Sequence, residues 1–487
     1  MELNKTACLP TDKPCKEFVG KSEKRKTWKL SLESEIPQTY EPCGFYSTKN
    51  SNIIIESAWL PYESDNGEVA LKPSLIIKTE SNDKSEIQVK EFLVKDLGLN
   101  IRGTFPNQDL KTLMSVNAVK TLLDNKPIDT KTVDLEIDQA TKRHIEIGGK
   151  RRIVLKRWIE GTYFYDVFDA FPILNIMGVS ESGKSRILRV VQAMAYHAES
   201  VVDPSPASIF RSKEEDHVTL CFDEAEYLND PSMNQTVRVL INASYSKGLS
   251  VPRYDEIDGK RVKRNFNLYS PFAIVGISGL EGVTASRAIR IVSERANRDY
   301  PVAKVEDYAD LRDKMYVLRF QEAFRLKQIY EQLDISDIVK ARFVELFKPL
   351  FALTKIFGTE AEYEALAEWA KEYQSVFRVE ALNVAEEEQI LSCLAQLQPL
   401  PDDWFSLKEL TDKVNLTFSR KLSYQRVSQI LMRMGITERR KVKGQTQFRV
   451  SKDDLELVAK RLGIELAEAE PKTDKKQLVD LFYRLRA

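Results

Sequence analysis

The sequence has few of the residues that build disulfide or zinc frameworks: five cysteines and three histidines among 487 residues. No two cysteines form a C-x-x-C pair, and Cys8, Cys15 and Cys43 are irregularly spaced. A four-ligand zinc site would need a partner such as a histidine from a distant part of the chain. Scattered, reduced thiols are therefore the simpler interpretation, and they are typical of an intracellular protein.

Long apolar runs and an excess charge are also missing. No run approaches the roughly 20 apolar residues of a membrane span, so no membrane association is expected. The start, MELNKTACLPTDKPCKEF, contains no apolar signal segment, which predicts a cytoplasmic protein. The 73 Lys and Arg balance the 73 Asp and Glu, so any affinity for nucleic acid must come from local basic patches.

What is present is ordinary globular material, 43% hydrophobic and 30% charged, in a chain long enough for roughly three domains. Apolar residues at three- and four-residue steps predict long helices within 311–333 and 341–358. The patterns divide the chain into a polar arm (1–43), a small α/β domain (44–150), an α/β core (151–300), a helical lid region (301–384), a compact unit (385–465) and a tail helix (466–487).

A phosphate-binding pattern lies at the start of the core unit. The residues GVSESGKS match G-x4-G-K-[ST], after the strand pattern FPILNIM and before a helix with one apolar face. Glycines let the backbone fold around phosphate, with N–H groups and the helix N-terminus directed at it. We expect Lys184 to reach the β- and γ-phosphates of ATP and Ser185 to ligate Mg²⁺; the alternative is a chance glycine turn. The predicted nucleotide-binding residues are Gly178, Val179, Ser180, Glu181, Ser182, Gly183, Lys184 and Ser185.

An acidic pair follows a second apolar strand, in HVTLCFDEAEYL. Asp223 is expected to hold Mg²⁺ through water, and Glu224 to orient and deprotonate the attacking water. Taken alone, the pattern also fits a strand end with solvated acids. Its distance from the phosphate loop leaves room for one strand and one helix, and the combination predicts ATP hydrolysis.

Two further strands complete the predicted site. The run PFAIVGISG ends at Ser278, whose hydroxyl would face the γ-phosphate. In VTASRAIRIVSE, Arg287 precedes a strand and Arg290 lies within it. Either arginine could enter a neighbouring subunit's site and stabilise the charge of the transition state. A solvated or salt-bridged arginine is the alternative at both positions.

This order of motifs resembles the AAA+ ATPases, and more closely the replicative helicases of plasmids, phages and integrated mobile elements, which are related to the minichromosome maintenance helicases. The resemblance covers about residues 150–360 and is carried by FPILNIMGVSESGKS, FDEAE, VRVLINASYSKGLSVPRYD through FNLYSPFAIVGISGL, and ASRAIRI. It implies a P-loop α/β core that uses ATP and Mg²⁺ and assembles into a ring, most simply a hexamer. Ser278 replaces the family's usual Asn or Thr, and no zinc site of the family's type is visible in the N-terminal part.

A basic hairpin is predicted between the acidic pair and the third strand. VPRYDEIDGKRVKRNFNLY turns at Asp258-Gly259, with Val262, Phe266 and Leu268 on one face. In the resembling helicases such a hairpin points into the pore and grips the DNA backbone, through contacts that ignore sequence and weaken with salt. The alternative is an exposed hairpin protected from aggregation by its charges. The predicted DNA-binding residues near its tip are Lys260, Arg261, Lys263 and Arg264.

The unit 385–465 has the order helix, helix and basic β-hairpin that is typical of a winged helix. Its second helix is predicted to begin after an N-cap at Ser423 and to end before Gly435, and the hairpin to turn near Lys443-Gly444. A winged helix that binds protein is the alternative. The predicted DNA contacts are Tyr424, Gln425, Arg426, Gln429, Arg439, Arg440, Lys441 and Lys443.

Two functions remain open, and they share the predicted ATP-site residues. The first is a ring-forming, ATP-driven DNA helicase or replication initiator of a mobile element, acting on single-stranded or forked DNA. The second is a non-translocating ATPase switch, such as a helicase loader, that binds DNA only through the winged helix. A protein-remodelling ATPase fits less well, because the pore loops of those machines typically carry an aromatic-apolar pair. The basic hairpin is therefore the feature that separates the first two.

Overall fold

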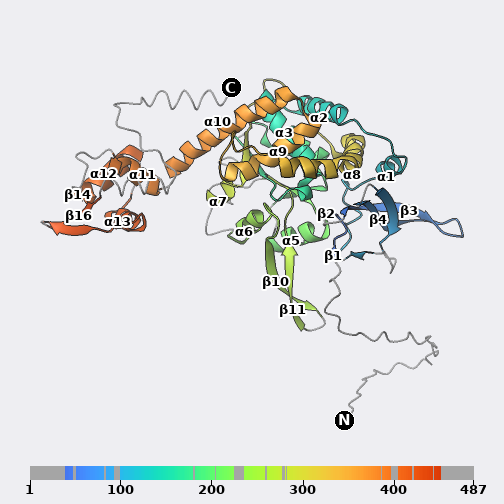
Figure 1. The fold of residues 1–487 in the computed structure, drawn as a ribbon, viewed down its shortest axis with the longest axis horizontal. Helices are drawn as coiled ribbons and strands as arrows, with labels where there is room; N and C mark the ends of the chain where they lie inside the picture. Colours follow the sequence, from blue (N-terminus) through green and yellow to red (C-terminus); the bar gives the residue numbers. More distant parts are fainter. Residues whose placement is uncertain are drawn as a thin grey trace, which may run out of the picture. The chain divides into compact units, whose positions relative to one another are not determined.

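The structure is a computed structural model, and Figure 1 shows the course of the chain. The residues that it describes are 39–47, 51–81, 84–92, 99–101, 103–178, 181–202, 205–223, 235–257, 260–276, 280, 282–384, 386–395, 404–418, 422–442 and 444–450.

A five-stranded, wholly parallel sheet has the strand order β13-β7-β12-β9-β8. Successive residues of a strand belong to hydrophobic clusters on opposite faces of the sheet. Leu174 and Ile176 lie in one cluster and Ile173 lies in the other, so both faces of the sheet are buried. Burial on both faces explains why these strands read as continuous apolar runs. The strands are β7 (Ile173–Met177), β8 (Ala198–Val202), β9 (Thr219–Asp223), β12 (Phe272–Gly276) and β13 (Ala288–Val292).

Helices cover both faces of this sheet. On one face, α4 (Lys184–Met194) packs against β7, β8, β9 and β12. Its predicted apolar face is confirmed, because Ile187, Leu188 and Val191 are buried. On the other face, α5 (Pro206–Glu215) and α6 (Gln235–Ala243) contribute to the second cluster. The predicted α/β character of the core is confirmed in this form: a parallel sheet with helices on both sides.

The amino-terminal part is an antiparallel sheet of order β2-β3-β4-β5 beside two helices. Ile54 and Ile76 face the large hydrophobic cluster that also holds residues of β7 and α4, while Ile53 and Ile77 face a smaller one. This part contains both strands and helices, which agrees with the α/β character predicted for residues 44–150. The elements are β1 (Thr39–Tyr40), β2 (Gly44–Ser47), β3 (Asn52–Glu63), β4 (Val69–Ser81), β5 (Lys84–Glu91), β6 (Asn100–Ile101), α1 (Val116–Leu123) and α2 (Thr130–His144).

Two long helices follow the parallel sheet, as predicted. α8 and α9 pack against each other, and α9 also packs against α3. None of the described helices has the length and apolar character that crossing a membrane requires. The helices of this part are α3 (Gly149–Thr162), η1 (Tyr165–Val167), α7 (Gly282–Ala285), η3 (Val305–Tyr308), α8 (Ala309–Gln332), α9 (Arg342–Phe357) and α10 (Glu360–Val384).

The carboxy-terminal elements have a hydrophobic cluster of their own, in which Leu410, Val414 and Ile430 are fully buried. β14, β15 and β16 form a small antiparallel sheet of order β14-β16-β15. Residues 451–487, including the predicted tail helix, lie outside the described residues. The elements are α11 (Glu386–Ala395), β14 (Trp404–Ser406), α12 (Leu407–Phe418), α13 (Tyr424–Arg433), β15 (Arg439–Val442) and β16 (Gln445–Arg449).

Candidate functional site

The predicted phosphate loop connects the end of β7 to the start of α4. Gly183 precedes the helix with φ +89°, a left-handed conformation that glycine adopts without strain. At Gly178 there is no room for a side chain, since a Cβ there would lie 2.6 Å from Ser182 Oγ and 2.7 Å from the carbonyl oxygen of Ser293. Gly183 is thus required for its backbone conformation, and Gly178 for its lack of a side chain. Val179 and Ser180 lie outside the described residues.

The lysine of the loop turns back toward the loop's own start. Lys184 is the first residue of α4, and its Nζ donates a hydrogen bond to the carbonyl oxygen of Gly178 at 2.8 Å. The side chain therefore spans the loop, with its ammonium at the carboxyl end of β7. An ammonium held there, beside the N-terminus of α4, can serve an anionic ligand.

Ser185 and Asp223 meet across the carboxyl edge of the sheet. The Ser185 hydroxyl donates a hydrogen bond to Asp223 Oδ1 at 3.3 Å, although 38 residues separate the two in sequence. The strand β12 lies between β7 and β9, so Ser185, near the start of α4, and Asp223, the last residue of β9, come from elements on either side of it. A hydroxyl and a carboxylate are oxygen ligands of the kind that Mg²⁺ takes. Glu224 and Ser278 lie outside the described residues; β12, the strand before Ser278, ends at Gly276.

The segment after β13 holds the phosphate loop in place. The backbone N–H of Ser293 donates to the carbonyl oxygen of Met177 at 2.7 Å, and its hydroxyl donates to the carbonyl oxygen of Ser182 at 2.6 Å. Arg295 then pairs with Glu181 at 2.9 Å on the exposed side of the loop. Neither Ser293 nor Arg295 could be predicted from the sequence, because their contacts with the loop depend on β13 lying beside β7.

A cavity of about 220 Å³, called here the loop cavity, lies beside the phosphate loop. It is smaller than the roughly 300–1,000 Å³ of complete ligand pockets, so it suits a part of a ligand. His144 is fixed at its edge, with its ring nitrogens 2.7 Å from the carbonyl oxygen of Pro301 and 2.6 Å from the Tyr308 hydroxyl. Further lining residues, which with His144 come from three segments of the chain, are Ile145, Glu181, Gly183, Arg186, Arg298 and Tyr300.

The two predicted arginines lie at different levels of the sheet, and Arg287 is away from the phosphate loop of its own chain. Ala288 pairs with Ile173, so Arg287 is at the amino edge of the sheet, one five-residue strand or about 15 Å from the loop. Its guanidinium donates to Asn242 Oδ1 at 3.2 Å. Arg290, opposite Asn175, stacks over the Phe377 ring at 5.2 Å. Arg287 is therefore separate from the site at the carboxyl edge of its own chain.

The predicted basic hairpin forms. β10 (Ser250–Ile257) pairs with β11 (Lys260–Asn267), and the pairing of Ile257 with Lys260 leaves two residues for the turn. Phe266 is buried and contacts Phe210, while Lys263 is exposed, which confirms the alternation where side chains are described. Asp258 and Gly259 of the turn, and the side chains of Lys260, Arg261, Val262 and Arg264, lie outside the description.

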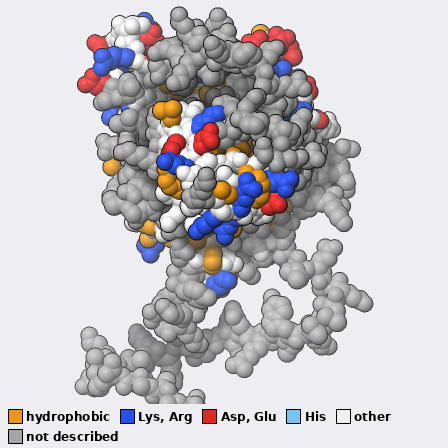
Figure 2. All heavy atoms as spheres, turned by 90° about the vertical axis from the view of Figure 1, so that its left-hand side faces the viewer, with side chains coloured by type: hydrophobic (Ala, Val, Ile, Leu, Met, Phe, Trp, Pro, Cys, Tyr) orange, Lys and Arg blue, Asp and Glu red, His pale blue; other side chains and the backbone are white. Residues whose placement is uncertain are grey.

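The predictions for the carboxy-terminal helix and hairpin also agree with the structure. Ser423 caps α13 by accepting a hydrogen bond from the Arg426 N–H at 3.2 Å, and Gly435 follows the helix with φ +93°. Gly444 turns the hairpin with φ +81°, and Lys443 lies outside the described residues. Figure 2 views the chain from the side on which Figure 1 draws these elements, and shows Lys and Arg side chains gathered there. The exposed predicted DNA contacts are Tyr424, Gln425, Arg426, Gln429, Arg439, Arg440 and Lys441.

Two of these arginines already have partners. Arg440 donates to Gln447 Oε1 at 3.0 Å and stacks over the Trp404 ring at 4.1 Å, which anchors the sheet's outer edge. Arg439 contacts Met432 Sδ at 3.8 Å.

Comparison with known proteins adds no assignment to this geometry: no family model matches the chain, and a search of curated proteins returns no match.

Proposed function

We propose that this protein is an ATP-dependent DNA helicase or replication initiator of a mobile genetic element, working as a hexameric ring. The observation that carries the ATPase part is the approach of Ser185 to Asp223, 3.3 Å apart, at the end of a strand–loop–helix with the phosphate-binding pattern. The resemblance to replicative helicases supports the mobile-element origin and the P-loop AAA+ core.

In the proposed reaction, the ammonium of Lys184 neutralises the β- and γ-phosphates, and Ser185 and Asp223 hold Mg²⁺. Bound Mg²⁺ supplies further positive charge to the phosphate oxygens. Glu224 accepts a proton from water while the water oxygen bonds to the γ-phosphorus. The bond from that phosphorus to the bridging oxygen breaks, releasing ADP and phosphate. Ser278 contacts the γ-phosphate and senses its presence.

The loop cavity is the proposed place of the base and ribose. It continues directly from Glu181, Ser182 and Gly183 of the phosphate loop, and its volume suits a fragment of ATP. Tyr300 and Ile187 offer apolar surface for the base. His144 is held by two hydrogen bonds and so forms a fixed wall.

A ring is proposed because Arg287 lies at the amino edge of the sheet, away from its own phosphate loop, and Arg290 stacks over Phe377. In a ring, Arg287 or Arg290 would complete the site of the adjacent subunit. Mixing a Lys184→Ala chain with an Arg287→Ala chain should then restore activity, because the first supplies the arginine and the second the intact loop. Random mixing brings the two together at about one site in four. Steady-state ATP turnover of the mixture, against each variant alone, measures this.

The matched control mixes Lys184→Ala with Asp223→Asn. Both substitutions damage the same site, so no mixture of these chains assembles an intact one. If the mixture with Arg287→Ala recovers no ATP turnover, Arg287 is not the trans-acting arginine. Arg290 is then the remaining candidate, and it is tested in the same way. Sizing in ATP and Mg²⁺ that gave only monomer, with and without DNA, would contradict the ring itself.

Two basic surfaces support DNA as the partner: the β10–β11 hairpin, proposed to grip backbone phosphates, and the carboxy-terminal module. In the second, the order α11, β14, α12, α13, β15 and β16 supports a winged helix with α13 as its recognition helix. The competing function is a non-translocating switch such as a helicase loader. The arginines of β15 favour it, since they could bind DNA without ATP-driven translocation.

ATP turnover measured with and without single-stranded DNA, alongside unwinding of a forked duplex, tests the proposal. A translocating helicase should hydrolyse ATP several-fold faster on DNA and separate the fork only when ATP and Mg²⁺ are present. Double-stranded DNA of the same composition is the control substrate. DNA binding without stimulation and without unwinding would favour the switch, and no turnover under any condition would overturn the ATPase proposal.

A further inference from the structure

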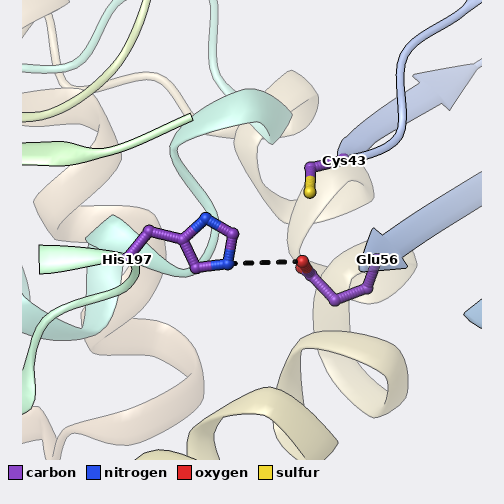
Figure 3. Close-up of side chains that lie close together, drawn as sticks. All are labelled: Cys43, Glu56 and His197. Atoms are coloured by element: carbon purple, nitrogen blue, oxygen red, sulfur yellow. Dashed lines mark ion pairs between the residues drawn. The ribbon is translucent and has the colours of Figure 1, made fainter. Parts of the chain in front are cut away.

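Three buried side chains from distant parts of the chain meet away from the phosphate loop. Cys43 precedes β2, Glu56 lies on β3, and His197 lies between α4 and β8. Their ligand atoms, Sγ, a carboxylate oxygen and a ring nitrogen, all lie within 4.8 Å of one another. Figure 3 shows the three side chains pointing toward a common centre.

The hydrogen bonds of His197 decide which ring nitrogen faces the centre as an acceptor. Nδ1 lies 2.9 Å from the backbone carbonyl oxygen of Asp216, which can only accept, so Nδ1 carries the proton. Nε2 therefore presents its lone pair to Cys43 and Glu56, and it has no hydrogen-bond partner although it is fully buried.

This arrangement is the one in which histidine binds metals. Metal-bound imidazoles almost always donate the other ring N–H to a carbonyl or carboxylate oxygen, which fixes the ring. His197 also holds a left-handed backbone, φ +43°, which is uncommon outside glycine and fixes the direction of its side chain. The lone pair of Nε2 faces an oxygen of Glu56 3.6 Å away, a separation that leaves space for a cation.

We propose that Cys43, Glu56 and His197 bind a zinc ion. Zn²⁺ takes thiolate, imidazole and carboxylate ligands together, at about 2.0–2.3 Å in tetrahedral geometry. Two ligand atoms at about 2.1 Å from such an ion lie roughly 3.4 Å apart. The observed separation of 3.6 Å between His197 Nε2 and Glu56 Oε1 is close to that value. Three protein ligands leave the fourth position to a water molecule.

The buried charges around Glu56 also favour a divalent cation. Arg319 pairs with Glu56 through Nε at 3.2 Å, but its guanidinium also forms two hydrogen bonds with Asp166, at 2.8 and 2.6 Å. The guanidinium is thus shared between two buried carboxylates, so a further cation beside Glu56 is electrostatically favourable. Tyr196 donates to both oxygens of Glu56 at 3.1 Å and orients the carboxylate.

The place of the site in the fold suggests what the ion does. Cys43 lines a second cavity of about 450 Å³, which offers a route from solvent. Glu56 belongs to the amino-terminal sheet. His197 is the third residue after the end of α4, the helix that begins at the phosphate loop. A zinc ion would therefore join the amino-terminal sheet to the far end of the phosphate-loop helix.

The test uses the full chain, stripped with a chelator and titrated with Co²⁺. We expect one equivalent of Co²⁺ to bind with the absorption of a cobalt–thiolate complex, and Zn²⁺ to displace it. The proposed Mg²⁺ site has no sulfur, so it cannot give this band. Cys43→Ser should abolish the band and weaken Zn²⁺ binding at least about 100-fold, since loss of an outer-shell partner alone costs about 10- to 100-fold.

Matched variants identify the ligands. Cys8→Ser/Cys15→Ser, Cys221→Ser and Lys184→Ala should all keep the band, and the last of these separates the metal site from the proposed ATPase. X-ray absorption on the unsubstituted zinc-loaded chain should show one sulfur ligand, a result that does not depend on whether Cys43→Ser folds. Two or more sulfur ligands, a band that survives in Cys43→Ser, or no thiolate band in the unsubstituted chain would each overturn the proposal.

Discussion

Replacing Lys184 with Ala is expected to lower ATP turnover by at least about 100-fold. Hydrogen bonds to charged groups contribute about 1.5–3 kcal/mol each, and Lys184 is proposed to contact both the β- and the γ-phosphate. Two such contacts amount to about 3–6 kcal/mol, which corresponds to about 100-fold or more. Its Nζ donates a hydrogen bond to the carbonyl oxygen of Gly178, and a thermal unfolding curve of the variant shows whether the fold survives the change.

Turnover and binding of a fluorescent ATP analogue should be measured together. Lys120→Ala, an exposed lysine on α1, is the control for loss of one positive charge. Glu224→Gln provides the contrast, because it should keep nucleotide affinity while stopping hydrolysis and so trap the ATP-bound state. Turnover at the parent rate in Lys184→Ala would contradict the phosphate-loop assignment. Turnover at the parent rate in Glu224→Gln would contradict only the choice of base.

The parts of this site that could be predicted from sequence are those set by local chemistry. A strand, a turn with two glycines and an amphipathic helix occupy consecutive residues, so the pattern alone predicts the phosphate loop. The same holds for the pairing of β10 with β11, and for Ser423 and Gly435 at the ends of α13. In each case the controlling interaction lies within a few residues.

The parts that could not be predicted depend on the order of strands. Ser293 supports the phosphate loop only because β13 pairs with β7, and His144 reaches the loop cavity from a helix that ends 34 residues before Gly178. The cluster of Cys43, Glu56 and His197 is equally non-local. One signal was present: in NIIIESAWL, Glu56 shares the inward face of β3 with Ile54 and Ala58, and a carboxylate among buried residues requires a partner.

Removing the positive charges of the β10–β11 hairpin should distinguish a translocating helicase from a non-translocating ATPase switch. The variant replaces Lys260, Arg261, Lys263 and Arg264 with Ala and changes no proposed ATP ligand. If the hairpin grips phosphates in a pore, basal ATP turnover should persist while DNA-stimulated turnover and unwinding fall to background. The pairing of β10 with β11 runs through backbone atoms, so the hairpin itself should remain.

A salt titration makes this prediction quantitative. Each lost phosphate contact removes about 0.7 from the slope of log affinity against log salt for single strands, so losing four contacts should flatten the slope by about 2.8. The matched control removes the same number of charges from the other basic hairpin, at Arg439, Arg440, Lys441 and Lys443. That variant should weaken duplex binding and loading but leave turnover on pre-loaded single-stranded DNA near the parent value.

The two quadruple variants give opposite results under the two functions. For a helicase, the β10–β11 variant stops unwinding even on DNA that is already bound, because translocation requires a grip at each step. For a switch that meets DNA only through the carboxy-terminal module, the β10–β11 variant resembles the parent, and the β15–β16 variant loses DNA affinity and any response to DNA. Unwinding at the parent rate without the four charges of the β10–β11 hairpin would exclude that hairpin as the gripping element, while the ATP site, which shares none of these residues, would keep its assignment.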